Sequence, residues 1–197
     1  MYHNLLTDRK LYEALVLFDE DLAAQARAAG CPCGGRLHAA HYPRKPRGGP
    51  TDLGPEYDRR WSFCCDRHGC RQRVTPASVR FLGRRVYLGV TVVLVTIMAH
   101  GLTAGRLSRL RQKLGGSLSV RTIERWRHWW RALFPASPFW KKARGRFVPA
   151  VQIPRLPVSL LERFLDETLG DRLHALLGFL SPITTRSLLG ASSSMGG

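Results

Sequence analysis

Acidic residues are almost absent from the middle of this chain. Residues 71–150 contain seventeen Lys and Arg but a single acidic residue, Glu124. Since the formal net charge of the whole chain is +17, nearly all of the excess positive charge lies in this one stretch. Cations concentrated in this way repel one another unless a polyanion lies beside them. The charge pattern therefore predicts a nucleic-acid partner; the alternative is a solvated basic surface without one.

Long apolar runs are also missing. The longest one, residues 86–99, has 14 residues and is interrupted by Gly89, Thr91 and Thr96. A helix needs about 20 apolar residues to cross a bilayer, so this run fits a buried helix better. Residues 1–4 show no sign of a basic and apolar leader. We therefore expect a cytoplasmic protein that has no membrane partner.

Cysteine is scarce and strongly clustered. The five cysteines form two groups, Cys31/Cys33 and Cys64/Cys65/Cys70. Thiols stay reduced in a protein that is not exported, and an odd number cannot all pair as disulfides. Two cysteine pairs, each within one turn of the chain, supply the four thiolates of a tetrahedral zinc site. The pattern predicts one structural zinc ion, with incidental thiols as the alternative interpretation.

The choice among the thiols follows from strand alternation. A strand is expected over residues 59–65, and Trp61, Phe63 and Cys65 then share one of its faces. Cys64 would point to the opposite side. The predicted ligands are therefore Cys31, Cys33, Cys65 and Cys70.

Two features of the spacing keep other ligands open. One residue separates the first pair, where two are usual, and 31 residues separate Cys33 from Cys65. The loop expected over residues 43–55, rich in Pro and Gly, can absorb this length. Cys64 or His68 is the alternative for one of the four positions.

The remaining pattern predicts a mainly α protein with a small β zinc ribbon. Apolar periodicity and capping residues predict helices over 8–28, 82–100, 103–114, 119–134, 159–169 and 171–180. Pro135 is expected to end the fourth helix, a capping box at Ser159 and Glu162 to begin the fifth, and Pro182 to end the last. The expected parts are an N-terminal amphipathic helix (1–30), a zinc ribbon (31–80), a helix-turn-helix domain (81–135), a basic irregular linker (136–157), a C-terminal helical segment (158–186) and a disordered tail (187–197).

Two of these helices flank a short turn at Gly115 and Gly116. Amphipathic helices joined in this way are typical of helix-turn-helix proteins, whose second helix enters the major groove of DNA. A basic helix packed in a bundle is the alternative. On the second helix, we expect a core face made of Ile123, Trp126, Trp130 and Leu133. The predicted DNA contacts are Arg106, Arg109, Arg121, Thr122, Arg125 and His128, with Lys141 and Lys142 on phosphates.

The order of these motifs resembles the N-terminal zinc ribbon and DNA-binding module of bacterial insertion-sequence transposases. The resemblance rests on Cys31-Pro-Cys-Gly-Gly, on Phe63-Cys-Cys and on Cys70-Arg-Gln-Arg-Val-Thr-Pro, followed by an apolar helix and the two flanking helices. It covers residues 31–134. It implies the same four cysteine ligands, recognition of transposon ends by the helical part, and a nucleoid-associated bacterial protein.

The catalytic part of such transposases is not matched. Their nuclease chemistry uses three spaced carboxylates that hold two metal ions. After Asp66 this chain has only Glu124 and four clustered acidic residues, Glu162, Asp166, Glu167 and Asp171. We therefore expect a non-enzymatic protein that binds double-stranded DNA, as an accessory or regulator of a transposon.

Two further hypotheses stay open from the sequence. The basic and aromatic residues over 136–147 would suit RNA or single strands. Alternatively, the chain is a DNA-binding subunit that works with a separate transposase catalytic chain. A second copy of this chain, bound through the C-terminal helices, is a further candidate partner.

Overall fold

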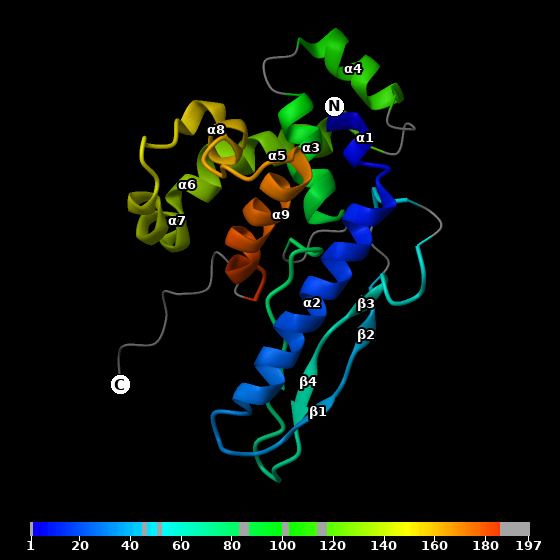
Figure 1. Cartoon of the computed structure of the whole chain (residues 1–197), viewed down its shortest axis with the longest axis vertical. Helices are drawn as coiled ribbons and strands as arrows, with labels where there is room; N and C mark the ends of the chain where they lie inside the picture. Colours follow the sequence, from blue (N-terminus) through cyan, green and yellow to red (C-terminus); the bar gives the residue numbers. More distant parts are fainter. Residues whose placement is uncertain are drawn as a thin grey trace. The chain divides into compact units, whose positions relative to one another are not determined.

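The chain divides into two compact units. The computed structural model describes residues 2–44, 47–50, 53–82, 87–99, 103–113 and 118–185. Among these, 4–89 together with 177–185 form the unit that we call the ribbon unit, and 90–176 together with 2–3 form the helical unit (Figure 1). Helices predominate and the strands are short and antiparallel, which confirms the mainly α fold with a small β part.

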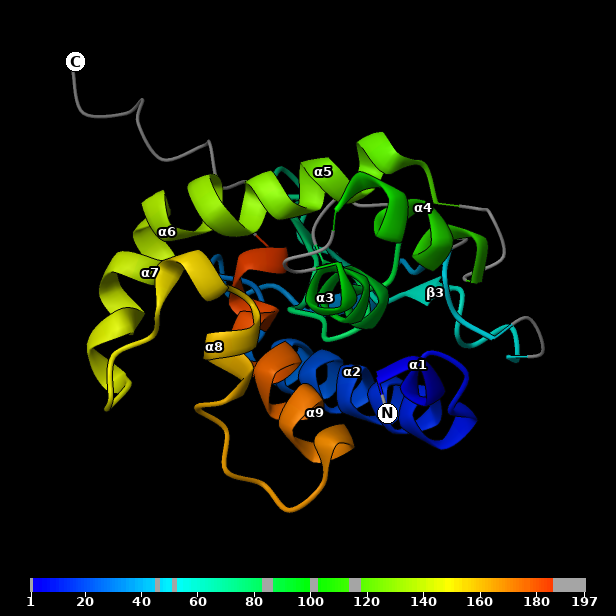
Figure 2. The same ribbon diagram turned by 90° about the horizontal axis from the view of Figure 1, so that it is seen from above.

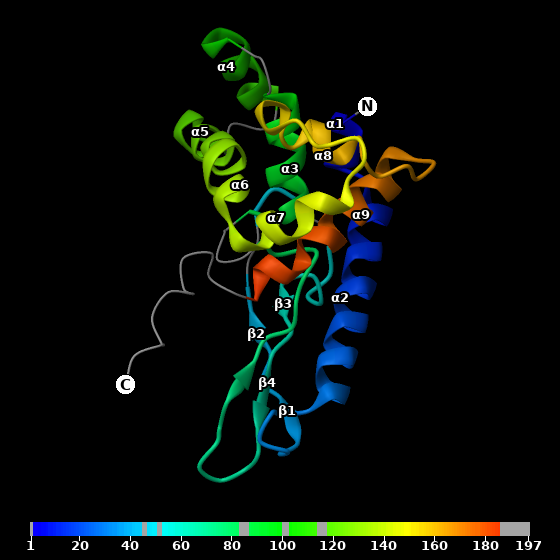
Figure 3. The ribbon, with the colours of Figure 1, turned by 90° about the vertical axis from the view of Figure 1, so that its left-hand side faces the viewer.

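The ribbon unit combines one long helix with two small sheets. The chain begins with α1 (Tyr2–Leu5) and α2 (Arg9–Ala29). The strands are β1 (Leu37–Ala39), β2 (Tyr42–Pro43), β3 (Arg59–Arg60), β4 (Phe63–Cys65) and β5 (Arg73–Val74). β4 is the central strand of the sheet β1-β4-β5, and β2 pairs with β3. Helix α2 runs alongside this β part in two views (Figures 1 and 3).

Helix α2 has clear start and stop signals. The Asp8 side chain accepts hydrogen bonds from the backbone N–H groups of Lys10 and Leu11 and so caps the first turn. Gly30 follows the last turn with a φ of 71°, a conformation that glycine adopts without steric cost. The helix thus matches the expected range closely. Its buried face consists of Leu11, Tyr12, Leu15, Asp19 and Ala23.

One buried residue of this face is charged, and its role was not predicted from the sequence. Asp19 and Arg80 form an ion pair of 2.8 Å, and both side chains are completely buried. The Asp19 carboxylate also accepts hydrogen bonds from the Ser78 hydroxyl and the Val79 N–H, at 2.6 and 2.7 Å. Arg80 donates in addition to the carbonyls of three residues that precede β4, Glu56, Tyr57 and Arg59. This network connects α2 to two segments of the chain, one that precedes β4 and one that follows β5.

The helical unit contains the remaining helices. They are α3 (Gly89–Met98), α4 (Ala104–Lys113), α5 (Val120–His128), a π-helix (Trp129–Leu133), α6 (Phe134–Ala136), α7 (Pro138–Ala143), α8 (Val158–Leu161) and α9 (Leu169–Leu180), with 3₁₀ turns at Arg144–Arg146, Ile153–Arg155 and Ser181–Thr184. The first residue of α3, the end of α9 and the turn Ser181–Thr184 belong to the ribbon unit. Within the described ranges, none of the helices has both the length and the apolarity to cross a membrane.

The helix that begins with α5 does not end at Pro135. It passes through the π-helix into α6, and Figure 2 shows the continuous course. The N–H of Phe134 bonds to the carbonyl of Trp129, five residues back, and this wider turn accommodates a residue that has no N–H. The expectation that Pro135 ends the helix was therefore wrong.

The same π-helix changes which residues are buried. One extra residue in a turn rotates the following side chains around the helix axis. Trp129 and Phe134 join the core, whereas Leu133, which we had placed on the core face, is 48% exposed. Ile123, Trp126 and Trp130 are buried as expected.

Two further expectations about the second half were wrong. The segment 136–157 is irregular only in part, because Ser137 caps α7 by accepting a hydrogen bond from the Trp140 N–H. Ser159 does not begin a capping box, since its hydroxyl donates to the carbonyl of Gln152 and α8 is only four residues long. Helix α9 begins at a cap by Thr168, whose hydroxyl accepts a hydrogen bond from the Asp171 N–H.

Two predicted features, the Gly115-Gly116 turn and the tail 187–197, lie outside the described residues.

Candidate metal centre and basic surface

Four cysteine sulfurs meet at one end of the ribbon unit. The Sγ atoms of Cys31, Cys33, Cys65 and Cys70 all lie within 4.8 Å of one another. The Cys31 and Cys70 sulfurs are 3.7 Å apart, and those of Cys33 and Cys65 are 3.5 Å apart. A tetrahedron with metal–sulfur bonds of about 2.3 Å has edges of about 3.8 Å. The four sulfurs therefore have the spacing of a tetrahedral metal site.

The first pair of ligands lies in a tight turn built by glycines. The Gly34 N–H bonds to the Cys31 carbonyl at 2.8 Å, and the Cys31 N–H bonds to the Gly35 carbonyl at 3.3 Å. Gly34 has a φ of 80°, which favours glycine. A Cβ atom on Gly35 would lie only 2.5 Å from the Cys65 sulfur. Only glycine at position 35 lets the two cysteine turns approach this closely.

The second pair of ligands is held by a similar turn. The Cys70 N–H bonds to the Arg67 carbonyl at 3.1 Å, and Gly69 has a φ of 83°. Arg71 follows with a φ of 44° and is the only described residue other than glycine with a positive φ. The chain then returns to the sheet, where the Cys65 N–H bonds to the Gln72 carbonyl at 3.0 Å. Both turns thus present their thiols to a common point.

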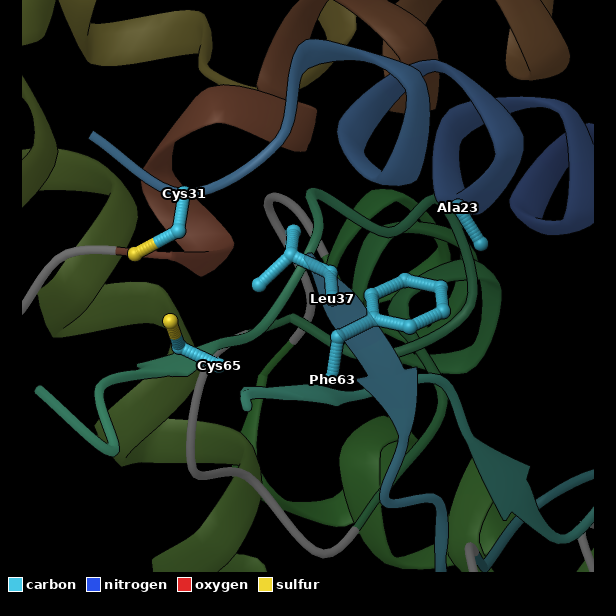
Figure 4. Packing of buried hydrophobic residues seen from close by; sticks show 5 residues of the cluster. All are labelled: Ala23, Cys31, Leu37, Phe63 and Cys65. Atoms are coloured by element: carbon cyan, nitrogen blue, oxygen red, sulfur yellow. The ribbon is translucent and has the colours of Figure 1, made fainter. Parts of the chain in front are cut away.

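The packing beneath the sulfurs explains why the turns meet. Ala23 of α2, Leu37 of β1 and Phe63 of β4 form one buried cluster with Cys31 and Cys65 (Figure 4). Leu37 lies directly opposite Cys65 in the sheet register. The two labelled sulfurs in Figure 4 face each other at the edge of this cluster. The apolar side chains position the strand, and the strand positions Cys65.

The pKa values of the Cys33 and Cys65 thiols are shifted in opposite directions. The backbone N–H of Gly35, followed by the thiols of Cys70 and Cys31, favours the Cys33 thiolate and lowers its pKa to about 6. The Arg67 N–H favours the Cys65 thiolate, but burial and the neighbouring thiols together outweigh it and raise the pKa of Cys65 to about 12. A cation at the centre would neutralise the thiolates and remove this opposition. The donor set therefore fits a thiophilic metal ion.

The two alternative ligands lie outside the sulfur group. Cys64 pairs with His38 and Arg73 across the sheet, on the face opposite to Phe63 and Cys65. Its sulfur lies 3.6 Å from the Arg71 carbonyl. The exposed His68 does not belong to the group either. Strand alternation thus correctly predicted that Cys65, and not Cys64, belongs to the group of four sulfurs.

The predicted DNA contacts on α5 are divided between its surface and its cap. Arg121, Arg125 and His128 are exposed. Thr122 is buried, and it takes part in the N-cap, since its N–H donates to the Ser119 hydroxyl at 3.1 Å. Arg125 donates to the Thr122 hydroxyl at 3.3 Å. Thr122 therefore holds the start of the helix and is not available to read a base.

The other predicted contacts lie on α4 and α7. Arg109 is exposed on α4, and the side chain of Arg106 lies outside the described residues. Lys141 and Lys142 are exposed on α7, next to the exposed Arg144 and Arg146. These four cations occur within six residues of sequence and face solvent.

Some aromatic residues near these cations are part of the core, whereas Phe139 and Phe147 are only partly buried. Trp129 and Trp140 are 3% and 2% exposed. Phe134 lies between them, with ring centroids 5.3 Å from Trp129 and 5.1 Å from Trp140. Trp140 is therefore not a free stacking platform for unpaired bases, which weakens the hypothesis of single-strand binding.

Comparison with protein-family models, curated proteins and solved structures gave no match. The resemblance to transposase modules therefore remains a prediction from the motifs.

Proposed function

We propose that this chain is a non-enzymatic, zinc-stabilised protein that binds double-stranded DNA. The observation that carries the proposal is the exposed face of α5. Arg121, Arg125 and His128 follow one another at steps of four and three residues, opposite the buried Ile123 and Trp126. Such a face can enter a major groove without disturbing the core of the helical unit.

The charge around α5 supports a phosphate partner. Arg131, Lys141, Lys142, Arg144 and Arg146 follow within one short stretch, and all five are exposed. Their number exceeds what solubility requires, whereas phosphates along a duplex would offset them. In this proposal α5 reads bases and the α7 cations contact the backbone.

The proposed metal is zinc, and its role is structural. Four thiolates fill a tetrahedral coordination shell, so no open position remains for a water molecule or substrate. Iron also accepts four thiolates in this geometry, but an iron site would colour the protein. The zinc ion would hold the two cysteine turns together and would take no part in a chemical reaction.

Salt dependence tests the DNA-binding proposal. The zinc-loaded protein should bind a random duplex with an affinity that falls by roughly three to five decades between 50 and 200 mM salt, if six to ten cations contact phosphates. Elemental analysis of the same sample should find one zinc ion per chain. A flat salt response, or tighter binding to single-stranded RNA than to duplex, would contradict the proposal.

The target is proposed from the motif resemblance. Selection from random duplexes should enrich a defined site, and terminal repeats of insertion sequences are the first candidates. A selection that enriches no site would limit the protein to unspecific DNA binding and remove the proposed role beside a transposase.

A further inference from the structure

We infer that the outer face of the ribbon sheet is a second duplex-DNA surface that binds phosphates through Arg71 and Arg73. The inference rests on the proposed DNA binding and extends it from the helical unit to the ribbon unit. It gives the metal-bound part of the chain a direct contact with the partner, in addition to its structural role.

The sheet has two different faces. Leu37, Phe63 and Cys65 are buried on the face that packs with Ala23 of α2. The opposite face, turned away from α2 (Figure 3), carries the cross-strand row His38, Cys64 and Arg73. Of this row, His38 and Arg73 are exposed and Cys64 is partly exposed.

Positive charge prevails on the outer face. Arg36 and Asp66 flank the row, and the Asp66 carboxylate already accepts the Arg36 N–H at 2.9 Å and contacts His38 Nε2 at 3.2 Å. The carboxylate is thus engaged at both oxygens. Arg73 lies on this face, and the Arg71 carbonyl lies 3.6 Å from the Cys64 sulfur, so that two exposed arginines are found beside the row.

Arg73 is held in place for a contact with an anion. Its Nη1 atom donates to the Ala40 carbonyl at 3.2 Å and to the Ser62 hydroxyl at 3.1 Å. Its guanidinium also lies 5.9 Å from the centre of the Tyr42 ring. A side chain fixed in this way loses little further conformational freedom when a phosphate binds.

Arg71 is the more informative residue. Its φ of 44° lies in the left-handed region, where glycine is the unstrained choice and other residues carry a cost. Within the described part of the chain, its exposed guanidinium makes no hydrogen bond or ion pair. By contrast, Arg67 of the same turn donates to the Cys33 carbonyl. Arg71 therefore keeps an exposed guanidinium that is available to a partner outside the chain.

Neutralising the metal centre would be another use for these cations. Four thiolates with one divalent ion leave two negative charges, and Arg67 already contacts the backbone of a ligand. Arg73 instead contacts Ala40 and Ser62, farther along the sheet from the sulfurs. The phosphate backbone of a duplex can instead contact both Arg71 and Arg73, which are two residues apart in the chain.

The substitution Arg71→Gly tests the inference, because it removes the cation and also relieves the backbone strain. In the full zinc-loaded chain, zinc content and melting temperature should stay the same or rise. Duplex affinity at 100 mM salt should fall by about five- to tenfold, and the slope of log affinity against log salt should become shallower by about 0.9. Arg71→Lys should restore most of the affinity.

Arg27→Ala is the matched control, since it removes one exposed cation from α2 of the same unit. It should leave affinity and slope unchanged. If Arg71→Gly behaves like Arg27→Ala, or if it releases zinc, the inference is overturned while the proposed function stands. If the unmodified protein shows no salt-dependent duplex binding, both are overturned. A loss confined to RNA binding would refute the duplex as the partner of this surface.

Discussion

At the scale of single residues, two adjacent thiols have opposite roles. Cys65 is fully buried in the sulfur group, whereas Cys64 lies on the outer face of β4. The variant Cys65→Ser should therefore lose the metal, because the remaining three thiolates cannot complete a tetrahedral site. Cys64→Ser should retain one metal ion per chain. Elemental analysis after gel filtration measures both.

The outcome of this pair also tests the register of the sheet. If Cys64→Ser loses the metal and Cys65→Ser keeps it, β4 pairs one residue out of the described register, since a shift of one residue exchanges the two faces. Such a result would also remove the basis for placing Arg73 on the outer face.

Asp19 gives the second prediction at this scale. Replacing it by alanine leaves Arg80 as a completely buried cation without its carboxylate partner. Breaking a buried pair in this way costs about 3–5 kcal/mol of unfolding free energy. Denaturant unfolding measures the loss. Asp21→Asn, an exposed position of the same helix, is the control and should change stability by less than about 0.5 kcal/mol.

These residues show what the sequence could and could not predict. Strand alternation is a local rule, and it was sufficient to prefer Cys65 over Cys64. The partners of Asp19 lie about sixty residues farther along the chain, at Ser78, Val79 and Arg80. No periodic pattern connects such distant positions, so the sequence did not predict the buried ion pair of Asp19.

At the scale of elements, the π-helix gives a testable change of register. Phe134 is fully buried and contacts the rings of Trp129, Trp130 and Trp140. Phe134→Ala should lower the unfolding free energy by about 3–5 kcal/mol, because it opens a cavity in this aromatic core. Leu133→Ala should cost much less, since half of that side chain faces solvent. Chemical denaturation of the two variants measures the difference.

A regular α-helix predicts a different result for the same pair. Continuing the steps of three and four from Trp126 and Trp130 would bury Leu133, as we expected from the sequence. Equal losses for both variants, or a larger loss for Leu133→Ala, would contradict the π-helix. Periodicity predicted the helix and most of its core face, but a single inserted residue has no sequence signal beyond the nearby Pro135.

At the scale of the whole molecule, the sulfur group and the basic helices belong to different units of the chain. The sulfur group lies in the ribbon unit, and the cations of α5 and α7 lie in the helical unit. The charge imbalance of residues 71–150 was evident from composition alone, because counting needs no structure. Which cations face solvent was not evident. The structure exposes Arg121 and Arg125 and buries Thr122 in the cap.

Within the helical unit, we expect cations on different helices to have different effects on DNA binding. Arg125 is exposed on the second turn of α5, where a guanidinium can reach guanine O6 and N7 in a major groove. Lys141 is exposed on α7 and is expected to meet phosphates only. Arg125→Ala should therefore reduce the preference for a selected site over random duplex by about 1–3 kcal/mol. Lys141→Ala should weaken binding to both duplexes equally.

Titrations of both variants against a selected and a random duplex, at several salt concentrations, measure these effects. For Lys141→Ala, the slope of log affinity against log salt should become shallower by about one unit for either duplex. For Arg125→Ala, the ratio of the two affinities is the decisive quantity, because loss of a phosphate contact alone leaves it constant. An unchanged ratio would mean that α5 does not read bases. The basic helix would then serve only to attract the duplex, and any sequence preference would have to arise from another surface of the chain.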